Sequence, residues 1–174
     1  MVRAMPRDAV TLAGLEHPAL FGKLPGHGDF IARGVPGALR QRLDAWLSDW
    51  LAAGRRTHGD NFVDVYESAA PWLFESPAST AVLLPSLDAV GRHFPLLAVC
   101  GAQAVTQDLY DALVDAVVAA QDSDALRAAL AALAPADPAA LRAAARWFVP
   151  EGAESALPAP DSVPSWPQVE GCFV

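Results

Sequence analysis

The chain has 174 residues, of which 53% are hydrophobic, and this length and composition suit one domain with a substantial shared core. Twelve lysines and arginines stand against twenty aspartates and glutamates, so the formal net charge is -8 at pH 7. This excess of negative charge disfavours sequence-independent binding to nucleic acid and to anionic membranes.

The N-terminal stretch is too weakly apolar for a secretory signal, because Thr11 and Gly14 interrupt its hydrophobic residues. Longer apolar runs such as Phe94 to Cys100 fall far short of the roughly 20 residues that cross a bilayer. We therefore expect a soluble, cytoplasmic protein with no direct membrane insertion. Cys100 and Cys172 form no C-x-x-C pair or zinc-type spacing, so we expect two free thiols and no metal or other cofactor.

The first predicted element is a short buried strand within residues 17–24, where Leu20, Phe21 and Leu24 are apolar. The turn-forming run from Pro25 to Asp29 closes it. Further on, Pro36 is well placed in the first turn of a helix, where its missing N–H costs nothing.

The helix after Pro36 is the clearest predicted element, and Gly54 is expected to end it. Its apolar residues recur at the spacing of one helix face, and its two tryptophans are interpreted as core rather than as a ligand platform. The apolar residues are Leu39, Leu43, Trp46, Leu47, Trp50 and Leu51.

Short apolar runs at 72–74, 81–84 and 94–100 predict three strands joined by compact loops. An antiparallel meander is the simplest arrangement, because the loop 85–93 is too short for a crossover between parallel strands. Residues 55–68 are compatible with either a short helix or a strand.

The second half is rich in alanine and leucine at helical spacing. One helix is predicted after Thr106 as candidate N-cap, a second from Ser123 to before Pro135, and a third from Asp137 to about Phe148. Five prolines between 150 and 167 predict an extended tail. The expected fold class is α+β, with a mostly antiparallel sheet of about 4–5 strands flanked by helices in a single domain.

Two segments resemble the TagF/ImpM family of type VI secretion-associated proteins. The segment from Phe21 to Phe30 reads FGKLPGHGDF and leads into the tryptophan-bearing helix, as in the opening motif of the family. The segment from Pro85 to Leu96 resembles the family's P-S-x-D-x-V-G-R-x-F-P-L motif. Two long motifs in the right order are far more specific than a lone glycine-rich loop.

The resemblance implies one TagF/ImpM-like domain over 1–174, with a signature region at 17–105, a helical region at 106–148 and an extended proline-rich tail at 149–174. It also implies a non-enzymatic cytoplasmic accessory protein that regulates, in the repressive direction, the assembly or activity of the type VI secretion system. The implied partners are protein components or regulators of that system, in some systems a forkhead-associated scaffold protein.

The residues in these motifs leave alternatives open. The run Gly26 to Asp29 lacks the pattern of a phosphate-binding loop, and Asp29 would repel phosphate, so a structural turn is favoured. Ser86 has no nucleophile elbow around it. A small metal-dependent or serine hydrolase remains as the alternative function, and a purely architectural subunit as a third hypothesis. The hydrolase would use His27, Asp29, Asp88 and His93, which show no zinc-type spacing.

The favoured interpretation of the two motifs is a structural network. Ser86 and Asp88 are expected to hydrogen-bond their own loop, and Arg92 to pair with Asp88 or with Asp29 of the other loop. A direct partner-binding role for Arg33, Asp88 or Arg92 is the competing interpretation. The candidate partner-binding or network residues are Gly28, Asp29, Arg33, Ser86, Asp88, Gly91 and Arg92, with no catalytic or metal-binding residue expected.

Overall fold

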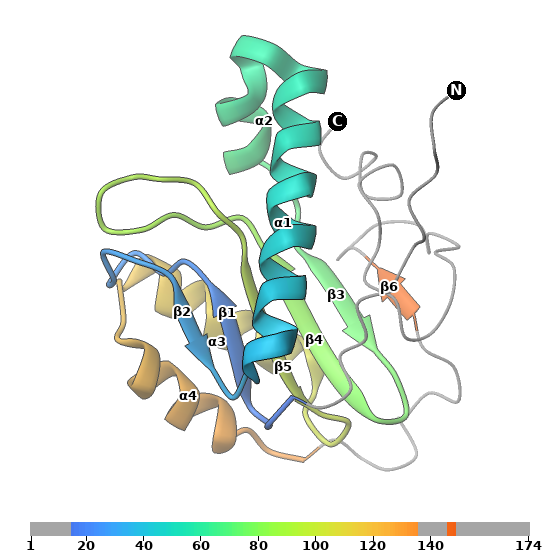
Figure 1. Cartoon of the computed structure of the whole chain (residues 1–174). Helices are drawn as coiled ribbons and strands as arrows, with labels where there is room; N and C mark the ends of the chain where they lie inside the picture. Colours follow the sequence, from blue (N-terminus) through green and yellow to red (C-terminus); the bar gives the residue numbers. More distant parts are fainter. Residues whose placement is uncertain (1–14, 136–145, 149–174) are drawn as a thin grey trace.

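A six-stranded sheet in the order β2-β1-β5-β4-β3-β6 forms the centre of the computed structural model, which describes residues 15–135 and 146–148 (Figure 1). Each pair of neighbouring strands is antiparallel. The predicted α+β fold is therefore confirmed, with one strand beyond the expected four or five. The strands are β1 (Ala19–Gly22), β2 (Ile31–Arg33), β3 (Trp72–Glu75), β4 (Ser79–Leu84), β5 (Leu96–Gly101) and β6 (Arg146–Phe148).

The predicted meander is the middle of this sheet. Strand β4 pairs with β3 on one side and with β5 on the other, in a register that runs from Ser79 opposite Gly101 to Leu84 opposite Leu96. Every residue of β4 is buried, which explains its apolar run without polar alternation. Helices must therefore cover both faces of the sheet.

The helices form one layer on each face of the sheet (Figure 1). On one face lie α1 (Gly37–His58), a 3-10 turn η1 (Gly59–Asn61) and α2 (Phe62–Glu67). On the opposite face lie α3 (Thr106–Val118) and α4 (Ser123–Ala131). Alternate residues of each strand consequently enter different hydrophobic cores.

The core beneath α1 and α2 takes Phe21, Ala81 and Leu83 from the sheet, and the core beneath α3 and α4 takes Leu20, Val82 and Leu84. Neighbouring residues of one strand thus face opposite helix layers, as the pleat requires. Helix residues supply the other side of each core. These are Leu39, Leu43, Leu47, Trp50, Leu51, Phe62 and Tyr66 for the first core, and Leu109, Leu113, Ala116, Leu126 and Leu130 for the second.

Helix α1 begins directly after Pro36, which is its N-cap rather than part of its first turn, and it continues past Gly54 to His58, so the predicted end is wrong. Gly54 is buried inside the helix, and the chain turns at Gly59 instead. The extra turn carries the chain toward α2, whose Phe62 and Tyr66 extend the same apolar core. Tertiary packing thus outweighs the low helix propensity of one glycine, which costs about 1 kcal/mol relative to alanine.

The tryptophans of α1 belong to the core, as predicted. Trp50 is buried, and Trp46 is half-buried and stacked on Trp50 with 6.3 Å between the ring centroids. The segment 55–68, whose sequence is compatible with either a helix or a strand, is helical and contains η1 and α2.

The start of α3 differs in detail from the prediction, because Val105 is the N-cap and Thr106 is the first helical residue. The Thr106 hydroxyl donates a hydrogen bond to Glu75 Oε1 of β3 at 2.9 Å instead of capping the helix. Helix α4 starts at Ser123 as predicted, with the Asp122 carboxylate accepting hydrogen bonds from the amides of Asp124 and Ala125.

The predicted third helix is wrong at its C-terminal end, because Arg146–Phe148 form strand β6 against β3. Pairing with a free edge of the sheet outweighs the local helical pattern there. The rest of that prediction, the proline-rich tail and Cys172 lie outside the described residues. Cys100 is a buried free thiol. Within residues 15–135 and 146–148, helices long and apolar enough to span a membrane are absent.

Candidate functional site

The two sequence motifs form loops that lie side by side at one end of the sheet. Strand β1 ends where β5 begins, with Gly22 paired to Leu96, so residues 23–30 and 85–95 emerge together. The Ala89 amide donates to His27 O at 2.8 Å, and Arg92 Nη2 donates to Gly28 O at 2.7 Å. We call residues 23–30 and 85–95 the loop pair.

Asp88 is the centre of the loop pair, and its carboxylate is fully buried. Oδ1 accepts hydrogen bonds from the amides of Val90 and Arg92, at 3.1 and 2.9 Å. Oδ2 accepts from Arg92 Nε at 2.7 Å and pairs with Lys23 Nζ at 2.9 Å. The predicted Asp88–Arg92 pair is therefore present.

Burial and hydrogen bonding shift the pKa of Asp88 in opposite directions. Burial alone would raise this pKa, but the amide of Arg92, the ammonium of Lys23, the guanidinium of Arg92 and the amide of Val90 together hold it well below its usual range. At neutral pH the carboxylate of Asp88 is therefore ionised, and it links the two loops through Lys23 and Arg92. A carboxylate held this way is a poor general base.

Lys23 belongs to the network of the loop pair but was not among the candidate residues. Its side chain is buried at 7% exposure, contacts Asp88, and lies 3.5 Å from Arg92 O and 5.0 Å from the centroid of the Phe30 ring. A lysine between Gly22 and Leu24, directly after a buried strand, was the available signal, because buried lysines require a partner.

Ser86 is held by its backbone rather than by its side chain, which corrects the expectation that its hydroxyl bonds the loop. The Tyr66 hydroxyl donates to Ser86 O at 2.9 Å and accepts from the Ser86 amide at 3.0 Å. The Ser86 Oγ is buried and has no hydrogen-bond partner among the described residues. No base is thus placed to activate it as a nucleophile within that part of the chain.

The other predicted residues take separate roles. Asp29 is exposed and accepts a hydrogen bond from the Phe30 amide instead of pairing with Arg92. Arg33 lies outside the loop pair, and its Nε is 2.8 Å from Oδ1 of Asp124 in α4. Gly91 has a φ of 83°, which favours glycine, where its amide closes a turn onto Asp88 O.

The glycine-rich run is a structural turn rather than a phosphate cradle. A Cβ on Gly26 would lie 2.5 Å from the carbonyl oxygens of Ala120 and Gln121, so the turn packs closely on the segment before α4. His27 Nε2 accepts a hydrogen bond from the Ser123 amide at 2.9 Å on the same side. The imidazole of His27 is thus hydrogen-bonded within the protein.

The four proposed metal ligands do not meet. His27 faces Asp122 and Ser123 beside α4, whereas His93 Nε2 lies 2.7 Å from Glu67 Oε1 of α2. Asp88 is occupied by two cations. In the described residues, no group of three histidine, cysteine or acidic side chains could hold a metal ion.

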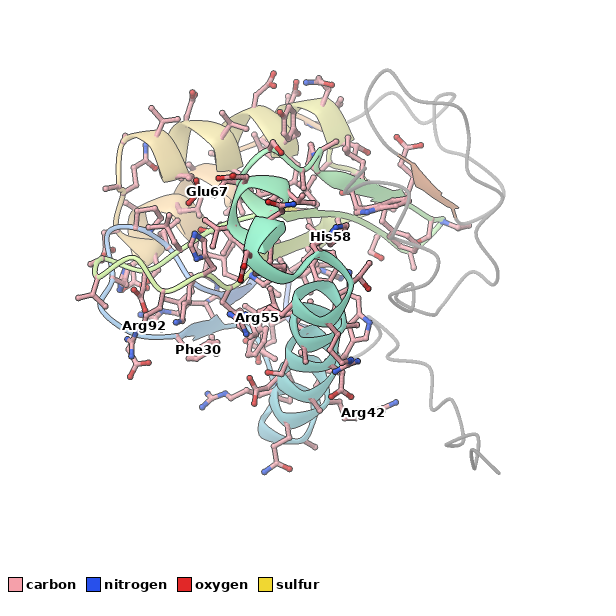
Figure 2. All side chains as sticks on the ribbon, turned by 90° about the horizontal axis from the view of Figure 1, so that it is seen from above. Phe30, Arg42, Arg55, His58, Glu67 and Arg92 are labelled. Atoms are coloured by element: carbon pink, nitrogen blue, oxygen red, sulfur yellow. The ribbon has the colours of Figure 1, made fainter. Side chains whose placement is uncertain are left out.

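The outer surface of the loop pair carries exposed apolar and cationic groups on a fixed support. Phe30 is 45% exposed and Val90 70% exposed, and the side chain of Arg92 is 59% exposed. The Phe30 ring packs edge-on against Phe94, with 4.6 Å between the centroids. Figure 2 shows Phe30 and Arg92 at the same margin of the molecule.

Comparison with known proteins gives three findings. Residues 19–146 match the family described as TagF N-terminal domain, type VI secretion system-associated. The crystal structure of PA0076 from Pseudomonas aeruginosa PAO1 is similar, with 31% sequence identity and a TM-score of 0.55 over 69% of this chain and 63% of that one. The chain therefore spans less than two thirds of that relative. A comparison with curated proteins gives no match.

The matched region contains both motifs and runs from β1 into β6. It covers most of the chain, including the loop pair. The chain belongs to the TagF N-terminal domain family of type VI secretion-associated proteins.

Proposed function

We propose that this protein is a non-enzymatic, cytoplasmic regulator that represses the type VI secretion system by binding one of its protein components or regulators. The observation that supports this most directly is the construction of the loop pair. Its buried charges satisfy one another, while Phe30, Val90 and Arg92 remain exposed on a rigid support. Exposed aromatic and arginine side chains held in place are typical centres of protein–protein interfaces.

Rigidity supports binding because it lowers the entropy lost on association. The Asp88 carboxylate ties both loops through Lys23 and Arg92, and Tyr66 anchors Ser86 from below. A partner would then meet a preformed surface to which Arg92 contributes a positive charge. The proposed partners include a forkhead-associated scaffold protein, and the net charge of -8 argues against nucleic acid.

Co-purification from the native bacterium, combined with a secretion assay, tests this proposal. We expect the wild-type chain to capture components or regulators of the type VI apparatus, and deletion of the gene to increase secretion. Val90→Gln is expected to reduce capture by about tenfold or more, since it places an amide in the exposed apolar surface.

The comparison variant is Val118→Gln, because Val118 is 82% exposed at the C-terminal end of α3 and lies outside residues 23–30 and 85–95. It should leave capture unchanged. Wild-type protein that captures nothing of the apparatus, together with unchanged secretion after deletion, would show the proposal to be wrong. Stoichiometric zinc or manganese in the purified protein would instead favour the hydrolase.

A further inference from the structure

Next to the loop pair, the surface has a hollow of about 410 Å³ between β2 and the N-terminal half of α1. Its apolar floor comes from the rings of Phe21 and Phe30, with Ala32 beside them. Its polar rim comes from Arg33 of β2 and from three residues of α1. Those three are Arg40, Gln41 and Asp44.

The floor of the hollow is held firmly. Phe30 stacks on Phe21 with 6.5 Å between the centroids, and both rings pack against Phe94. Lys23 supports the Phe30 ring and is itself fixed by Asp88. The exposed ring therefore offers a preformed apolar contact rather than a mobile side chain.

The rim of the hollow is rich in hydrogen-bonding groups. Arg40 is exposed and forms no ion pair with other described residues, including Asp44 one turn further along α1. The Nε of Arg33 pairs with Asp124, and the side chain of Arg33 is still 36% exposed. The rim has two arginines against one carboxylate, Asp44, and arginine forks pair strongly with carboxylates, so the rim favours an acidic ligand.

The charge distribution over the helices agrees with this preference. Helix α1 carries four arginines against two aspartates, although the protein as a whole is acidic. In contrast, residues 106–131, which span α3 and α4, contain five aspartates and one arginine. An acidic partner is therefore attracted to the α1 side and repelled from the opposite side at distances of about 10 Å or less.

Strand β2 adds a further recognition element, because it is the outer strand beside β1 in the sheet order. Within the described residues, no strand pairs with its other edge. Outer strands accept extended peptides through backbone hydrogen bonds, while pockets beside the strand receive side chains. The hollow lies between this strand and α1.

We propose that this hollow binds an extended acidic peptide segment of a partner protein, with one apolar side chain on Phe30 and carboxylates on Arg33 and Arg40. This inference rests on the proposed regulatory function and names the chemistry of the partner. Gln41 and Asp44 are placed to bond the backbone of the segment. The segment of the partner must therefore carry an apolar side chain with acidic residues close to it.

The test uses the full-length, ¹⁵N-labelled protein and a synthetic peptide with a central leucine–phenylalanine pair flanked by glutamates. We expect amide shifts concentrated in residues 30–33 and 37–44. Arg40→Glu should weaken peptide binding by about tenfold or more. The fold should survive, because glutamate is favourable near the N-terminus of a helix.

Arg56→Glu is the matched control, since Arg56 is an exposed arginine sixteen residues further along the same helix, about 24 Å away. It should leave peptide affinity within about twofold of wild type. A second peptide with lysines in place of glutamates should not bind. No shifts with the acidic peptide, shifts mapped elsewhere, or equal losses in the two variants would overturn the proposed groove.

Failure of the groove is distinguishable from failure of the regulatory role. Capture of the apparatus that persists in Arg40→Glu, with no peptide binding, would remove the groove and leave the regulator intact. Peptide binding at residues 30–44 without any capture of the apparatus would support the groove and contradict the regulatory role.

Discussion

The hydroxyl of Tyr66 satisfies both backbone polar groups of Ser86 across twenty residues of sequence. Burial raises the pKa of Tyr66, so the phenol stays protonated and donates at any physiological pH. Tyr66→Phe would leave the buried amide of Ser86 without a partner, whereas the Ser86 carbonyl keeps its hydrogen bond from the Phe94 amide at 3.0 Å. We expect it to lower the free energy of unfolding by roughly 1 to 3 kcal/mol, measured by urea denaturation.

Tyr110→Phe is the control at the same scale, because Tyr110 is half-buried on α3 and the chain has only these two tyrosines. This substitution should change the free energy of unfolding by no more than about 0.5 kcal/mol. Equal effects of the two substitutions would contradict the role assigned to the Tyr66 hydroxyl.

At the scale of the element, α1 depends on the turn that ends it. Gly59 has φ 55° and ψ -127°, a combination that glycine adopts and other residues avoid, and a Cβ there would meet no other atom within 4 Å. Gly59→Ala therefore costs backbone strain alone. We expect a loss of about 1 to 3 kcal/mol in thermal or urea unfolding.

Gly37→Ala provides the comparison within the same helix. Gly37 is the first residue of α1, has ordinary backbone geometry, and also has open space at its Cβ. Alanine should stabilise the protein there by up to about 1 kcal/mol. A Gly59→Ala protein as stable as Gly37→Ala would show that the turn tolerates side chains.

At the scale of the whole molecule, two carboxylates make stability depend on acid. Hydrogen bonds hold the pKa of Asp88 below its usual range despite burial, and the Asp124 and Ala125 amides lower that of Asp122. A lowered pKa in the folded state gives stability that is present above the unfolded value, about 3.9, and lost as the pH falls through the folded value. We expect urea unfolding to show falling stability below about pH 4.

Asp88→Asn tests the assignment of this acid dependence. The variant should be less stable at pH 7, because Lys23 then lies buried without its counter-charge. The difference from wild type should narrow below about pH 4, where wild-type Asp88 begins to lose its advantage over the unfolded state. A difference that stays constant from pH 7 to pH 3 would contradict the proposed ionic tie.

Part of the fold and of the candidate site was predictable from the sequence alone. The α1 stripe, the β3–β4–β5 meander and the start of α4 were predictable, because periodicity and capping act between residues close in sequence. The Asp88–Arg92 pair was predictable for the same reason, since its members lie four residues apart.

Tertiary structure alone decided the partners that lie far apart in sequence. Arg33 bonds Asp124 across 91 residues, and Lys23 reaches Asp88 from another loop. The same holds for β6, where edge pairing with β3 replaces a locally helical pattern, and for α1, whose continuation past Gly54 depends on packing of α2. Such contacts join residues that are far apart in sequence, so no local pattern encodes them.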